Sequence, residues 1–336
     1  CSNEHAECRK GSDDAWIPSR LIDIHDYRSS GQVRIVSRND IELSQFGEQP
    51  RYTTLSHVWG THTFLTLVHS NLQNLRSGFP VSGLPKTFTQ AIAVTEKIGL
   101  RYLWIDSLCI IQDSAEDWRV EAGSMDKVYL NSFCTIAASL AANPNEGLFW
   151  DRNAELSKPF AVQFMSPPRP TQFRVFLDLQ FLILDHSPLY KRGWVLQESL
   201  LSPRTMHFSK LPAFECREIF ACESYRTTGA KSASADLLYR TRKTIARAEE
   251  FTYSNWCGIV FDYSRCNLTK GTDKLIALCG IAKVVSSVIP GGYFAGIWAE
   301  WWLQGLLWMV DRGEELAPIR PWEEYRGISV LSRVLL

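Results

Sequence analysis

Helical and strand-like hydrophobic patterns alternate through residues 84–139. Over residues 85–99, apolar side chains recur every three or four positions, which predicts a helix with one buried stripe. Residues 102–111 are apolar almost throughout, as in a strand that is covered on both faces. A Ser-x-x-Asp capping box opens a second amphipathic stretch over residues 114–129, and residues 133–138 are again strand-like. This succession predicts a parallel sheet with helices packed on its faces.

Weaker patterns surround this core. Residues 157–185 are first proline-rich and then imperfectly alternating, which predicts a β insertion. After residue 222 the patterns are mainly helical, with helices expected at 232–254, 273–285 and 294–309, the last of them sandwiched by its tryptophans. We therefore predict an α/β domain over residues 1–222, in which helices flank a mainly parallel sheet. A helix-rich part over residues 223–336 is expected to pack on it.

One carboxylate interrupts the apolar strand at residues 102–111. Burying Asp106 is costly unless it is paired or hydrogen-bonded, and polar residues near the carboxyl ends of parallel strands usually face a ligand crevice. His57 and Trp59 likewise lie at the carboxyl end of another predicted strand, which starts at residue 51 and is ended by Gly60. Alternatives stay open for all three: Asp106 could bond a loop backbone, His57 could be a core histidine and Trp59 a structural lid.

A second stretch rich in functional groups runs from Arg192 to Leu201 and predicts a short helix. Glu198 is the acid in it that we would test first. It could instead cap the helix or form an ion pair with Arg192 or Arg204, since ion-pair networks also perturb carboxylates.

Three blocks of this chain occur together in a known family. They are YTTLSHVWG at residues 52–60, WIDSLCI at 104–110 and RGWVLQESLLSPRTMHF at 192–208. With these blocks in this order, roughly residues 17–222 resemble the fungal heterokaryon-incompatibility (HET) domain. The resemblance implies a cytoplasmic effector that triggers growth arrest or cell death. It also implies a remote likeness to the Toll/interleukin-receptor (TIR) fold, whose enzymatic members cleave NAD with a single glutamate.

The resemblance and the residue patterns together define the candidate site. Its candidate catalytic residues are Glu198, Asp106 and His57, and its candidate ligand-binding residues are Trp59, Trp104, Arg192, Trp194, Gln197 and Arg204. NAD is expected as a substrate and not as a bound cofactor, and another incompatibility protein is an expected partner. Two other functions stay open. One is a cofactor-independent, Diels–Alderase-like pericyclase of fungal secondary metabolism, acting on a hydrophobic terpenoid. The other is a non-catalytic interaction module, in which Trp104, Trp194 and Gln197 serve as core and cap residues.

Composition narrows these possibilities only slightly. The 336 residues are 45% hydrophobic and 21% charged, as in a globular protein, and their net charge of zero gives no footprint for nucleic acid or an anionic membrane. Twelve tryptophans indicate an aromatic-lined pocket as well as a core. No signal peptide, membrane span, GxGxxG, P-loop, GxSxG or HExxH pattern occurs in the sequence.

Nine scattered cysteines predict reduced thiols of an intracellular protein. Cys109 is expected to be an inert core thiol because its surroundings are apolar. Cys1, His5 and Cys8 could hold zinc with a fourth ligand, but no second pair follows at finger spacing. We therefore predict a terminal segment with unpaired thiols and no metal site. The start at Cys1, without methionine, indicates a fragment.

Overall fold

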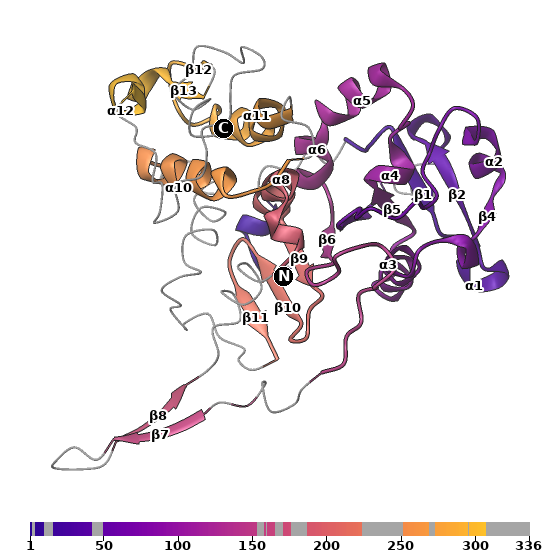
Figure 1. Cartoon of the computed structure of the whole chain (residues 1–336), viewed down its shortest axis with the longest axis horizontal. Helices are drawn as coiled ribbons and strands as arrows, with labels where there is room; N and C mark the ends of the chain where they lie inside the picture. The colour runs from indigo at the N-terminus through magenta and orange to yellow at the C-terminus, as the bar shows by residue number, and fades with distance from the viewer. Residues whose placement is uncertain are drawn as a thin grey trace.

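A nine-stranded sheet runs through the middle of the protein in a computed structural model (Figure 1). The structure describes residues 1, 4–9, 16–41, 50–152, 158, 160–164, 171–175, 187–223, 251–268, 273–294 and 296–306. In spatial order the strands are β11 (Phe220–Cys222), β10 (Ala213–Cys216), β9 (Arg204–His207), β6 (Cys134–Ala137), β3 (Tyr52–Ser56), β5 (Tyr102–Ile105), β1 (Arg20–Asp23), β2 (Gln32–Ser37) and β4 (Phe79–Pro80).

The sheet is mixed. Strands β9, β6, β3 and β5 are parallel to one another through three pairings, whereas the remaining five pairings in this sheet are antiparallel. The predicted α/β class is confirmed, but the prediction of a mainly parallel sheet is wrong. The reason lies in the connections: flanking strands joined by short loops, such as β9, β10 and β11, can only pair antiparallel.

The four parallel strands have the order of a flavodoxin-like core. Counted along the chain from β3, their spatial order is 2-1-3-4, and the direction of winding reverses between β3 and β6. Right-handed crossovers therefore place the helices after β3 and those after β5 on opposite faces of the sheet. In such sheets, ligands bind outside the carboxyl ends of the strands at this switch point.

The helices between these strands follow the sequence pattern closely. Helix α3 (Lys86–Lys97) packs against β3 and β5, and its buried stripe is Thr87, Phe88, Ala91, Ile92 and Thr95. Gly99 adopts a positive φ of 85° just beyond it. The second predicted helix is two helices, α5 (Ala115–Ala122) and α6 (Met125–Leu130), and the Ser114 hydroxyl accepts the Asp117 N–H at 3.2 Å as its cap.

The central apolar strand is shorter than its composition indicates. It ends at Ile105, and Asp106 begins the one-turn helix α4 (Asp106–Cys109). Cys109 is fully buried there, and burial raises the pKa of its thiol to about 12, as expected for a core cysteine.

A second hydrophobic core forms where helix α8 (Gly193–Leu201) meets α10 (Tyr253–Ser264) and α11 (Lys274–Val285). In the described part of the helix predicted at 294–309, the chain instead forms a hairpin of β12 (Tyr293–Phe294) and β13 (Ile297–Trp298), followed by η8 (Ala299–Trp301) and α12 (Trp302–Leu306). Gly296, with a φ of 103°, makes the hairpin turn that interrupts the helical pattern. Trp302 is 55% exposed, so the prediction of a sandwiched helix is wrong.

The remaining elements are short. They are η1 (Glu7–Arg9), α1 (Tyr27–Ser30), η2 (Arg38–Asp40), α2 (Leu72–Ser77), η3 (Val81–Gly83), η5 (Leu189–Lys191) and the separate hairpin of β7 (Phe160–Phe164) and β8 (Thr171–Val175), which confirms the β insertion. Most of the helix expected at 232–254 lies outside the described residues, and the domain boundary at residue 222 stays a prediction. Within the described segments, no helix has both the length and the apolarity that crossing a bilayer requires.

Candidate functional site

Three of the candidate residues meet at the carboxyl ends of β3 and β5. His57 and Trp59 directly follow β3, and Asp106 directly follows β5. The indole Nε1 of Trp59 donates a hydrogen bond to Asp106 Oδ2 at 2.8 Å. His57 Nδ1 lies 3.8 Å from Asp106 Oδ1. Because neighbouring parallel strands end at the same edge of a sheet, residues almost fifty positions apart come into contact here.

Helix α8 brings two more candidates to this place. Arg192, which precedes the helix, donates a hydrogen bond to the backbone carbonyl of His57. Glu198 projects from the middle of α8 and is 4% exposed. We refer to His57, Trp59, Asp106, Arg192 and Glu198 as the Glu198 cluster.

The electrostatic environment makes Glu198 unusual. Burial raises the pKa of its carboxyl group to about 7, and the negative charge of Asp106 acts in the same direction. The positive charge of Arg192 and the hydroxyl groups of Ser56 and Tyr129 oppose this rise in pKa. A carboxyl group with this pKa can exchange a proton near neutral pH, as a general acid or base must.

His57 has the opposite behaviour. Burial and, to a smaller extent, the positive charge of Arg192 lower the pKa of its imidazole to about 4, although Asp106 favours the protonated ring. His57 is therefore neutral at pH 7. A neutral imidazole can donate one hydrogen bond and accept another, so it can orient a polar ligand without adding charge.

Several buried polar atoms around the cluster have no hydrogen-bond partner among the described residues. They are Ser56 Oγ, both ring nitrogens of His57, Trp104 Nε1, Ser107 Oγ and Glu198 Oε2. Buried polar groups are nearly always hydrogen-bonded, so each exception needs an explanation such as an ordered water, a ligand or a catalytic role. This concentration at the carboxyl ends of β3 and β5 is the strongest structural indication of a functional site.

The other predicted ligand-binding residues play different parts. Trp104 is fully buried, with its ring edge-to-face against Tyr129 at a centroid distance of 5.8 Å. With its amide oriented to match its neighbours, Gln197 donates to the Ala277 carbonyl at 2.8 Å and accepts the Asp126 N–H at 2.9 Å. Gln197 thus ties α8 to α6 and α11. Trp194 packs against both hydrophobic cores.

Arg204 lies elsewhere. It starts β9, at the amino ends of the parallel strands, and donates hydrogen bonds to the carbonyls of Phe133 at 3.0 Å and Cys8 at 3.4 Å. The structure therefore does not bring Arg204 to the Glu198 cluster. Among the described residues Glu198 forms no ion pair with Arg192 or Arg204. Of these two arginines, only Arg192 influences the pKa of the Glu198 carboxyl.

Sequence reasoning missed Tyr129 and His207. Tyr129 ends the amphipathic stretch at residues 114–129, which indicates only a buried helical position, yet its hydroxyl acts on Glu198. His207, at the carboxyl end of β9, lies between the Tyr190 hydroxyl at 3.0 Å and Glu215 Oε2 at 3.2 Å. Its position inside the third family block was the only signal that could have drawn attention to it.

The chain is thus an α/β protein with a flavodoxin-like parallel core and a buried acidic cluster at its switch edge. Residues 52–198 match the family model described as Heterokaryon incompatibility protein (HET). The matched residues include every member of the Glu198 cluster. No curated protein and no solved structure matches the chain. The HET resemblance is confirmed and indicates a heterokaryon-incompatibility-type protein, whereas the fungal origin and the TIR likeness stay predictions.

Proposed function

We propose that this HET-domain protein is an effector enzyme that hydrolyses NAD, with the Glu198 carboxylate as its essential general base. The observation that carries the proposal is the buried Glu198 carboxyl, whose Oε2 has no hydrogen-bond partner in the part of the chain that the structure describes. Burial raises the pKa of this carboxyl to about 7, so it can exchange a proton at neutral pH. The HET match over residues 52–198 supports the proposal because it includes this glutamate.

The chemistry asks for a carboxylate in this setting. Hydrolysis breaks the bond between the nicotinamide nitrogen and ribose C1′, and water forms the new bond to C1′. Nicotinamide leaves as a neutral molecule, while positive charge develops on the ribose ring in the transition state. The Glu198 carboxylate accepts the proton of the attacking water, and the negative charge of Asp106 stabilises the cationic ring.

Trp59 and Arg192 position these groups. Trp59 holds Asp106 through its 2.8 Å hydrogen bond, which fixes the direction of that carboxylate. Arg192 favours the ionised form of Glu198 and thereby keeps the pKa of its carboxyl from rising further. The active form is the Glu198 anion, so the rate of NAD cleavage rises with pH through about 7.

The test is to incubate the purified chain with NAD and to measure nicotinamide and ADP-ribose by chromatography. We expect both products in equal amounts, and a rate at least about 100-fold lower for Glu198→Gln, the loss typical of a missing acid–base group. The matched control is Glu116→Gln on α5, whose side chain is 71% exposed and pairs with Arg119. Intact NAD, or an unchanged rate in Glu198→Gln, would refute the proposal.

The same pair of variants separates the proposal from the interaction module. When the chain is expressed in a host cell, an NAD-consuming enzyme arrests growth only with Glu198 intact. If the chain is instead an interaction module whose motif residues only hold the fold, a folded Glu198→Gln variant should still arrest growth. No feature of the described residues favours a pericyclase over these two, so that function stays a prediction.

A further inference from the structure

Four potential metal ligands from distant parts of the chain meet at one end of the sheet. They are Cys1, His5 and Cys8 from the N-terminal segment and Cys216 from the end of β10. One ligand atom from each residue lies within 4.8 Å of all the others. Cys216 Sγ is 3.3 Å from His5 Nδ1, although 211 positions separate the two residues.

We propose that these four residues bind one zinc ion in a tetrahedral Cys3His site. Zinc prefers thiolate and imidazole ligands, and Cys3His is one of the common sets for structural zinc. Zn–S and Zn–N bond lengths of about 2.3 and 2.1 Å bring tetrahedral ligand atoms to within about 3.5 to 3.8 Å of one another. The four atoms already lie close to this spacing, so a small contraction around the ion completes the geometry.

The backbone next to Cys216 supports a thiolate at this position. The N–H groups of Glu218 and Ile219 point at Cys216 Sγ from 3.5 and 3.4 Å. The turn that presents them is closed by a hydrogen bond of 2.9 Å from the Cys216 N–H to the Ile219 carbonyl. Donors directed at a ligand sulfur stabilise its anionic, metal-binding form and fix its orientation. A thiol that only filled space would not require them.

Hydrogen bonds independent of any metal also hold the N-terminal segment in place. The Glu7 N–H donates to Glu218 Oε1 at 2.8 Å, and Arg217 donates to the Glu7 carbonyl at 3.1 Å. Arg204 reaches the Cys8 carbonyl at 3.4 Å. The ligands are therefore preassembled. Because all four positions are supplied by the protein, the site has no open position for a substrate and its role is structural.

This zinc site is independent of the Glu198 cluster. Cys216 pairs in register with Arg204, the first residue of β9, so the zinc site lies at the amino ends of the parallel strands. The Glu198 cluster lies at their carboxyl ends. The ion would fasten the N-terminal segment to the hairpin of β10 and β11 without touching the reacting groups.

The experiment is to purify the full chain without chelators, measure its metal content by mass spectrometry, and titrate the reduced, metal-free protein with Zn²⁺. We expect one Zn²⁺ per chain. Titration with Co²⁺ should produce the intense visible absorption of tetrahedral cobalt bound to thiolates. Loss of a residue that only hydrogen-bonds to a metal ligand lowers metal affinity by up to about 100-fold. His5→Ala removes a ligand itself, so it should weaken Zn²⁺ binding by more than this factor.

Two further variants keep the test decisive even if His5→Ala folds poorly. His5→Cys restores four ligands and should again bind one Zn²⁺, which a purely structural role for the imidazole does not predict. Cys257→Ser, at an exposed cysteine on α10, should bind zinc like the unchanged chain. The proposal is wrong if the reduced chain takes up no stoichiometric Zn²⁺, if it forms a Cys8–Cys216 disulfide and binds no zinc after reduction, or if His5→Ala binds zinc as well as His5→Cys.

Discussion

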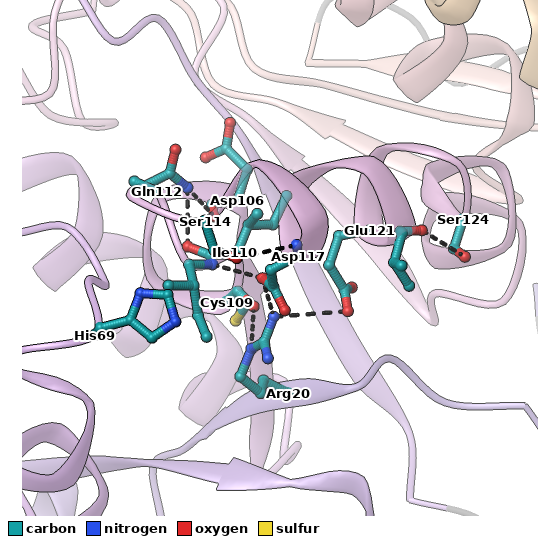
Figure 2. A network of polar contacts seen from close by, with 12 residues as sticks. Arg20, His69, Asp106, Cys109, Ile110, Gln112, Ser114, Asp117, Glu121 and Ser124 are labelled. Atoms are coloured by element: carbon teal, nitrogen blue, oxygen red, sulfur yellow. Dashed lines mark hydrogen bonds and ion pairs between the residues drawn. The ribbon is translucent and has the colours of Figure 1, made fainter.

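Two buried polar clusters lie on either side of the short helix α4, and they have opposite properties. On one side, Arg20 donates to the Cys109 carbonyl at 2.6 Å and to Asp117, and Glu121 lies 3.6 Å away (Figure 2). Asp117 also accepts the Ile111 N–H at 2.8 Å. We call this the Arg20 network. Figure 2 shows the Asp106 carboxylate directed away from this network. On that other side lies the Glu198 cluster, with its unpartnered atoms among the described residues.

The difference shows how a single helical turn can separate stability from function. In the Arg20 network each charge has an opposite charge or a backbone group beside it, as a structural ion-pair network requires. In the Glu198 cluster, burial without complete pairing moves the pKa of Glu198 up and that of His57 down. Titrating groups whose pKa values are moved in opposite directions within one site are the pattern found at acid–base sites.

The largest expected effect is the loss of Arg20. Arg20→Met leaves Asp117, Glu121 and the Cys109 carbonyl without their shared donor, and should lower the free energy of unfolding by about 3–5 kcal/mol. Denaturant unfolding measures this. NAD cleavage per folded molecule should not change. Arg119→Met is the matched control, because Arg119 pairs with Glu116 at the surface, and it should leave stability unchanged. An equal loss in both variants would contradict the comparison.

The next effect is a change in the pH dependence of stability at Glu198. The pKa of its carboxyl is about 7 in the folded chain, against an ordinary value of 4.5. This difference corresponds to a change of about 3 kcal/mol in the free energy of unfolding over that pH range. Between these pH values the folded protein holds a proton that the unfolded chain has lost, so this group makes stability fall as pH rises. Glu198→Gln should remove that fall, and unfolding curves at pH 4.5 and pH 8 test it. If Glu198→Gln is no more stable at pH 8 than the unchanged chain, the ionised Glu198 carboxylate does not lower stability, which contradicts this prediction.

His57 should show the opposite slope. The pKa of its imidazole is about 4 in the folded chain against 6.5 ordinarily, so the unfolded chain binds the extra proton between these values. Stability from this group is present above pH 6.5 and is lost as pH falls toward 4, again by about 3 kcal/mol. His57→Gln should remove this loss. Between pH 4.5 and 6.5, the contributions of Glu198 and His57 to the pH dependence of stability nearly cancel in the unchanged chain. We therefore expect the double variant to show the same dependence of stability on pH as the unchanged chain in this range.

The smallest effect concerns Trp59. Trp59→Phe keeps an aromatic ring but removes the 2.8 Å hydrogen bond to Asp106, and should lower stability by about 1 kcal/mol. If Trp59 orients Asp106, the rate of NAD cleavage should fall by more than this loss of stability explains. Comparing rate per folded molecule with thermal stability separates the two effects, and a rate equal to that of the unchanged chain would leave Trp59 a structural role only.

The sequence by itself determined those features that depend on neighbours along the chain. Helical spacing predicted α3, the Ser114 cap was visible as a short motif, and three family blocks identified the HET domain. The same blocks contain all five members of the Glu198 cluster. Local spacing suffices here because hydrogen bonds and capping within a helix join residues three or four positions apart.

Only the tertiary structure decided what those residues experience. Whether Glu198 is paired or left without a partner depends on how far α8 is buried over the strand ends, which spacing along the chain does not encode. Arg204 shares a sequence block with Glu198 but lies at the other edge of the sheet. Cys216 joins His5 across 211 positions because β10 ends where the N-terminal segment docks. Burial and long-range pairing set pKa values and ligand geometry, and both are properties of the folded chain.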